Sequence, residues 1–207
     1  MRLFIAEKPE LARAIANGMD GKQEKFDGYI KIGNDIITWA FGHILELCEP
    51  EEYDEKYSKW NLADLPFEIN DFKYKPKEKS KAQLKAIIKL INDSQITEIV
   101  NCGDYDEEGQ ILIDEIIIYS KTKKPVKRML LQDITEAGIK KSLKDLRPNS
   151  DFKGMSDSGF ARSQADWLVG LNLTRAYTIK ARQQNAISIK VLSVGRVHTP
   201  ILGLIVS

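Results

Sequence analysis

Apolar and polar positions along this chain follow two periods, one typical of strands and one typical of helices. Residues 3–5 form a short continuous apolar run and residues 96–102 form a mainly apolar one, and both predict buried strands. Residues 28–40 alternate apolar and polar positions on either side of a Gly-Asn pair, which predicts a hairpin. Residues 84–91 carry leucine and isoleucine at the spacing of an amphipathic helix. This alternation up to about residue 146 predicts a small parallel α/β domain with helices on both faces of its sheet.

The pattern breaks at residues 147–150, Arg-Pro-Asn-Ser, where we place a domain boundary. The first domain is therefore expected to span residues 1–146. Residues 151–207 carry a long helical pattern over residues 160–182, and they are expected to begin a second, mainly helical domain.

An acidic turn, residues 103–110, follows the second apolar run and precedes a further apolar helix pattern. Three carboxylates alternate along it: Asp104, Asp106 and Glu108. In parallel α/β sheets this junction lies at the carboxyl edge of the strands, where ligands usually bind. Clustered carboxylate oxygens suit a hard divalent cation, above all Mg²⁺. Taken alone, such a motif is more often a solvated acidic turn.

Glu7 and Lys8 stand at a second strand-to-helix junction, between the first apolar run and Pro9. Two such junctions can face each other at one edge of a parallel sheet. We therefore expect Glu7 to lie near the acidic turn, although the two segments are far apart in sequence. His43 has no second histidine nearby, and by itself it is more typical of a structural residue.

Composition adds a charge asymmetry and several exclusions. Residues 151–207 hold seven basic and three acidic side chains, a net charge of +4. The remainder of the chain holds 24 basic and 27 acidic side chains, a net charge of −3. The C-terminal part is therefore the better candidate to face a polyanion.

Cys48 and Cys102 lack metal-ligand spacing, which favours a reduced, cytoplasmic protein. No apolar run approaches the roughly 20 residues of a membrane span, and no nucleotide-binding glycine motif is present.

Six stretches, taken together and in order, resemble the type IA DNA topoisomerases, and within them the topoisomerase III branch. Each is moderately specific, the series of six is highly specific, and the six are spread over essentially the whole chain. They are Met1–Pro9 (MRLFIAEKP), Gly42–Leu47 (GHILEL), Trp60–Pro66 (WNLADLP), the acidic turn, Ala165–Ala176 (ADWLVGLNLTRA) and Leu192–Pro200 (LSVGRVHTP).

The resemblance implies a Toprim fold, a Rossmann-like parallel sheet with flanking helices, for residues 1 to about 140. It implies that Glu7, Asp104 and Asp106 are associated with Mg²⁺ and that Glu108 completes the acidic set. Glu7 would also move a proton at the 3′ oxygen, and Lys8 would contact the scissile phosphate and stabilise its charge.

The same resemblance implies a path for single-stranded DNA. Tryptophan offers a face for base stacking, and arginine neutralises phosphate without reading sequence. Taken alone, Trp60 is more typical of a core anchor, and the arginines of the long helix are typical of a solvated face. The implied path residues are Trp60, Trp167, Arg175, Arg182, Ser193, Val194, Gly195, Arg196, Val197 and His198.

The implied reaction is ATP-independent, Mg²⁺-dependent strand passage through a transient 5′-phosphotyrosine, which stores the energy of the broken bond. None of the seven tyrosines stands in the sequence context of the family's nucleophile. We therefore expect an N-terminal fragment that is inactive alone, from an enzyme of the bacterial cytoplasm and nucleoid. The expected partner is single-stranded DNA, without a nucleotide cofactor.

The chain departs from the family at several positions. The family usually has Pro and Arg where this chain has Tyr105 and Glu107, Ser at Glu10, and Gln at His198. Glu107 is expected to increase cation attraction and weaken phosphate approach. Two alternatives stay open: a Toprim metal-dependent nuclease or primase-like enzyme, and a non-catalytic single-strand DNA-binding module.

Overall fold

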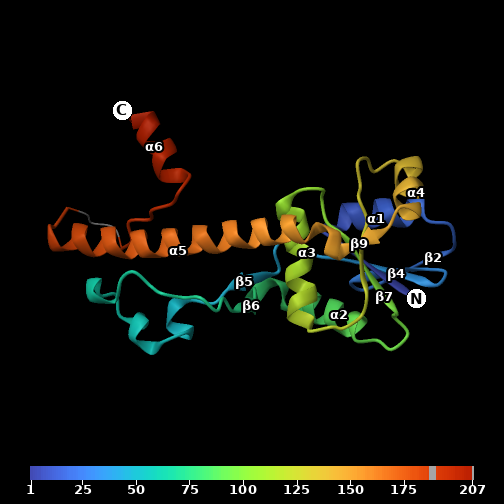
Figure 1. Ribbon diagram of the computed structural model, residues 1–207, viewed down its shortest axis with the longest axis horizontal. Helices are drawn as coiled ribbons and strands as arrows, with labels where there is room; N and C mark the ends of the chain where they lie inside the picture. Colours follow the sequence, from blue (N-terminus) through green and yellow to red (C-terminus); the bar gives the residue numbers. More distant parts are fainter. Residues whose placement is uncertain (187–189, 207) are drawn as a thin grey trace. The chain divides into compact units, whose positions relative to one another are not determined.

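The computed structural model describes residues 1–186 and 190–206 (Figure 1). The chain divides into two compact units. The first comprises Met1–Glu46 and Lys75–Phe160, and the second comprises Leu47–Tyr74 and Ala161–Ser207. The second unit thus takes in an early segment of the chain as well as its C-terminal part. The predicted domain limits, 1–146 and 151–207, stay predictions.

A seven-stranded mixed sheet lies at the centre of the first unit. Its four central strands run parallel, whereas the strands at both edges pair antiparallel. The predicted parallel α/β domain is confirmed for this centre, and the antiparallel edges add to it. In spatial order the strands are β2 (Gln23–Phe26), β3 (Tyr29–Ile32), β4 (Asp35–Trp39), β1 (Arg2–Ala6), β7 (Glu98–Cys102), β8 (Val126–Arg128) and β9 (Arg147–Pro148).

The register of the two innermost strands decides where the site can form. Ala6, the last residue of β1, lies opposite Cys102, the last residue of β7. The strands are parallel, so the residues that follow them emerge side by side at one edge. Both predicted junctions are therefore brought to the same place.

Helices flank this sheet, and their apolar faces form the core. On one side, α1 (Pro9–Gly18) packs with α4 (Glu136–Lys144), and their apolar residues join those of β1, β3 and β4 in one cluster. On the other side lies α2 (Lys81–Ile91), which contacts α3 (Glu107–Ser120) (Figure 1). The helix after the acidic turn begins at Glu107; its residues 109–116 are buried, whereas Ile118 and Tyr119 are exposed.

The remaining elements are short, apart from one long helix. A separate two-stranded sheet pairs β5 with β6, and α5 begins within the first unit and continues in the second. The bounds are β5 (Leu45–Leu47), β6 (Tyr74–Pro76), α5 (Lys153–Gln183) and α6 (His198–Val206), with 3-10 turns η1 (Pro50–Glu52), η2 (Glu55–Ser58), η3 (Leu62–Asp64), η4 (Glu78–Ser80) and η5 (Asn149–Phe152). Within residues 1–186 and 190–206, no helix has the length and hydropathy needed to cross a membrane.

Candidate functional site

The structure brings Glu7, Lys8 and Asp104 together at the carboxyl edge of β1 and β7. The backbone N–H of Asp104 donates to Glu7 Oε2 at 3.2 Å. Lys8 Nζ lies 3.2 Å from Asp104 Oδ2 and 3.9 Å from Glu7 Oε1. This hydrogen bond to Asp104 raises the pKa of Lys8, so the amine is protonated at neutral pH. One ammonium group is thus held by two carboxylates from distant parts of the chain.

The acidic turn is folded tightly by its own residues. Asp106 is the N-cap of α3, and its Oδ1 accepts from the backbone N–H of Gly109 at 2.7 Å. A Cβ added to Gly103 would lie 1.9 Å from the carbonyl oxygen of Gly109, and one added to Gly109 would lie 2.5 Å from backbone atoms of Asp104. The two glycines therefore let the ends of the turn approach closely, which directs Asp104 towards Lys8.

A buried arginine supports the turn from below, and sequence reasoning missed it. Arg128 is fully buried; its Nη1 donates to the carbonyl oxygen of Gly103 at 2.8 Å and its Nη2 to that of Asp104 at 2.7 Å. Burial lowers the pKa of its guanidinium. Arg128 is the last residue of β8 and follows Lys127, so the strand pattern does not show which of the two charged side chains is buried. Its contacts fix the backbone that carries Asp104.

His43 belongs to the site region, although the sequence suggested a purely structural histidine. Its Nδ1 lies 3.0 Å from Glu115 Oε2, and its Nε2 lies 2.7 Å from Glu108 Oε1. The hydrogen bond to Glu115 is the main cause that raises the pKa of His43 to about 9. Burial raises the pKa of Glu115 itself. The ring is therefore an imidazolium between two carboxylates at neutral pH.

We expect His43 to make the free energy of unfolding fall as pH rises into the alkaline range. Its folded pKa of about 9 exceeds its ordinary value of 6.5, so its stabilisation is complete below pH 6.5 and is lost as pH rises through 9. The difference in the free energy of unfolding between the wild-type chain and His43→Gln should shrink over this range, because the ring loses its proton. We expect a change of about 1 kcal/mol, since water screens the exposed edge of the ring and reduces the effect. Urea unfolding in EDTA at pH 6 and pH 9.5 measures it; a constant difference would contradict the assignment.

The predicted metal ligands fit a hard cation by their chemistry, but they are not gathered around one point. In the described part of the chain, no three His, Cys, Asp or Glu side chains are grouped so as to hold a metal ion. Glu7 and Asp104 lie together around Lys8, whereas Asp106 caps α3 and Glu108 bonds to His43. Two carboxylates that already flank a cation are suitable oxygen donors for a divalent ion.

The two unusual residues of the acidic turn contact the segment that leads into α5. The ring of Tyr105 lies edge-on to that of Phe152, with centroids 6.4 Å apart. The Oγ of Ser158 donates to Glu107 Oε1 at 2.7 Å. Tyr105 and Glu107 therefore both contact other residues of the first unit. The expected effect of Glu107 on the attraction of cations and the approach of phosphate stays a prediction.

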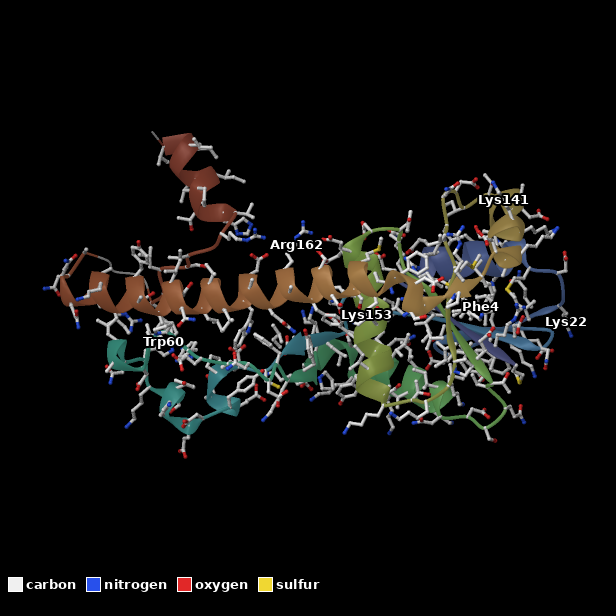
Figure 2. All side chains as sticks on the ribbon, in the orientation of Figure 1. Phe4, Lys22, Trp60, Lys141, Lys153 and Arg162 are labelled. Carbon is white, nitrogen blue, oxygen red and sulfur yellow. The ribbon has the colours of Figure 1, made fainter. Side chains whose placement is uncertain are left out.

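In the second unit, Arg175 is enclosed by its neighbours. Its guanidinium carbon lies 5.1 Å from the ring centre of Trp60 and 4.8 Å from that of Phe67. Its Nη1 donates to the carbonyl oxygen of Tyr57 at 2.5 Å, and its side chain is only 6% exposed. Burial lowers its pKa. Arg175 thus holds Trp60 beside α5 (Figure 2), and its predicted contact with DNA stays a prediction.

Trp60 also lines a basic cavity of about 690 Å³ in the same unit. The other lining residues are Lys59, Arg182, Lys190 and Val191. The guanidinium of Arg182 donates to the carbonyl oxygen of Lys190. The structure therefore places two predicted DNA-path residues, Trp60 and Arg182, at one cavity, together with two lysines that sequence reasoning did not single out.

The other predicted path residues are held along α5. The Trp167 ring contacts those of Tyr53 and Phe72. Val194 exchanges hydrogen bonds with Thr174, and Arg196 forms an ion pair with Asp166. Ser193, Gly195 and Val197 belong to the same segment, and His198 begins α6.

Comparisons with known proteins match both parts of the chain. The Toprim domain family matches residues 2–134, and a family described as DNA topoisomerase matches residues 150–207. DNA topoisomerase 3 of Vibrio cholerae is 47% identical over 99% of this chain, and DNA topoisomerase 3 of Haemophilus influenzae is 46% identical over 100% of it. The chain spans 32% of each of these relatives, about a third of their length.

A solved structure shows the same fold. Full-length topoisomerase I from Thermotoga maritima has a TM-score of 0.56 and 17% identity, over 83% of this chain and 25% of that one. At this identity the likeness concerns the fold alone, and it agrees with the sheet and helices described above.

Proposed function

We propose that this chain supplies the acidic site of a strand-passage enzyme. Its family supports this proposal: the chain belongs to the Toprim family and to the type IA DNA topoisomerases of the topoisomerase III branch. The enzyme would break and rejoin one strand of DNA with Mg²⁺ and without ATP. The observation that carries this proposal is the placement of Lys8 between Glu7 and Asp104, where two parallel strands end.

The residues of this edge have distinct proposed roles. Lys8 would bind the non-bridging oxygens of the scissile phosphate and stabilise the charge that develops there. Glu7 would give a proton to the departing 3′ oxygen and take it back when the strand is rejoined. Glu7, Asp104, Asp106 and Glu108 would hold Mg²⁺, which would neutralise charge around the broken end when bound.

The strand itself would be guided by the second unit. The indole of Trp60 offers a face for a base, and Arg182 with its two neighbouring lysines offers charge for the phosphates. We assign Trp167, Arg175 and residues 193–198 to the same path. The attacking tyrosine would lie outside these 207 residues, and the 5′ phosphate would stay covalently attached to it. We place this activity in the bacterial cytoplasm, at the nucleoid.

The test is relaxation of a negatively supercoiled plasmid by the complete gene product. We expect relaxation with Mg²⁺ and no ATP, its arrest by EDTA, and a denaturant-trapped protein–DNA adduct at a 5′ end. The 207-residue chain alone is expected to bind single-stranded oligonucleotide without forming the adduct. Cut oligonucleotide without attached protein would instead indicate a metal-dependent nuclease, and DNA binding without relaxation would indicate a binding module.

A further inference from the structure

The segment that carries His43 is tied to the strand end that carries Glu7. The backbone N–H of Ala40 donates to the carbonyl oxygen of Ala6 at 2.8 Å, and that of Gly42 donates to the carbonyl oxygen of Glu7 at 3.3 Å. His43 is therefore held at the same edge of the sheet as the acidic turn.

The two carboxylates that flank His43 come from one helix. Glu108 and Glu115 are seven residues apart on α3, two turns along the same face, so one imidazole can reach both. Their environments differ, because the Glu115 side chain is 4% exposed and that of Glu108 is 62% exposed. The buried contact with Glu115 fixes the ring, and the ring then directs Nε2 at the exposed carboxylate of Glu108.

This arrangement separates Glu108 from the other acidic side chains of the site. Glu7 and Asp104 share Lys8, while Glu108 is retained by His43 at 2.7 Å. In the described part of the chain, no third His, Cys, Asp or Glu side chain joins Glu7 and Asp104 in a group that could hold a metal ion. A cation that binds Oε1 of Glu108 must compete with its hydrogen bond to His43.

We propose that His43, fixed by Glu115, is a positioning residue that withholds Glu108 from the metal site until a divalent cation displaces it. This inference rests on the proposed function, because it assumes that Glu7 and Asp104 bind a divalent cation. Hydrogen-bond partners of a ligating carboxylate usually support metal binding, whereas here the partner is itself a cation that competes with the metal for Glu108. The pair would thus set how strongly Mg²⁺ is held.

The inference predicts a non-additive effect on Mg²⁺ affinity. In calorimetric titration of the 207-residue chain, His43→Gln should bind Mg²⁺ about 3- to 10-fold more tightly, because Glu108 is released. Glu108→Gln should weaken Mg²⁺ binding, because it removes a ligand that the cation recruits, and the double variant should bind like Glu108→Gln. Arg13→Gln, which removes an exposed cation of α1 paired with Glu10, is the charge control and should change affinity less than twofold.

The outcomes separate this inference from the proposed function. If the wild-type chain binds no Mg²⁺, the proposed metal site and this inference both fail. If it binds Mg²⁺ but His43→Gln tightens binding equally with Glu108 replaced, only the positioning role is wrong, since charge removal then explains the gain. If His43→Gln does not fold, ring ¹⁵N shifts of His43 give the answer: Mg²⁺ should move Nε2 in the wild-type chain but not in Glu108→Gln. An unmoved Nε2 in the Mg²⁺-bound wild-type chain would overturn the inference.

Discussion

Gly109→Ala and Gly103→Ala are each expected to destabilise the first unit by about 3 kcal/mol, the largest stability effects we anticipate. The added methyl group would meet backbone atoms across the turn, at 2.5 Å in the first case and 1.9 Å in the second. Backbone cannot swing aside as a side chain can, so the turn must open. Opening it costs the Asp106 cap and the hydrogen bonds of Arg128 to the carbonyl oxygens of the turn. Urea unfolding followed by circular dichroism measures the loss.

The matched control is Gly154→Ala, near the start of α5. A Cβ there would meet nothing within 4 Å, and alanine favours a helix more than glycine does. This variant should be neutral or more stable by up to about 1 kcal/mol. Equal stabilities for Gly109→Ala and Gly154→Ala would show that the turn is not as tight as its backbone distances indicate.

The centre of this fold was predictable because each strand and each junction leaves a local signal. The apolar run at residues 3–5 and the mainly apolar run at residues 96–102 indicate where β1 and β7 end, and parallel pairing then brings Glu7 and Asp104 to one edge. The acidic turn could be located in the same way, since its carboxylates stand between a strand pattern and a helix pattern. Chemistry placed at strand ends is therefore open to sequence reasoning.

The supporting contacts were not predictable, because their partners are distant and their own surroundings carry no signal. Arg128 follows Lys127 in β8, and the strand pattern does not reveal that its guanidinium reaches two carbonyl oxygens of the acidic turn. Glu115 lies within the apolar pattern of α3, and only the fold shows that His43 contacts it. Likewise, nothing local shows that Leu47–Tyr74 joins Ala161–Ser207 in a second unit.

Lys8→Met is expected to lower the rate of plasmid relaxation by the complete gene product about 100-fold or more, the largest effect on activity. Without the ammonium group, the phosphate would approach Glu7 and Asp104 with no protein cation beside them. Repulsion between the phosphate and the two carboxylates then opposes the transition state more than the ground state, because negative charge on the phosphate and the departing 3′ oxygen increases as the bond breaks. Initial relaxation rates at saturating Mg²⁺ measure the effect, and Lys8→Arg should recover part of the loss.

Two comparisons separate this catalytic loss from a structural one. The Lys8 and Asp104 side chains are both about half exposed, so removing their ion pair should change the free energy of unfolding by less than about 1 kcal/mol. Lys81→Met removes a comparable surface pair with Glu78, on η4 and α2, and should leave relaxation unchanged. Near-normal activity of Lys8→Met would remove Lys8 from the chemistry, whereas low activity with normal folding would assign it to the phosphate.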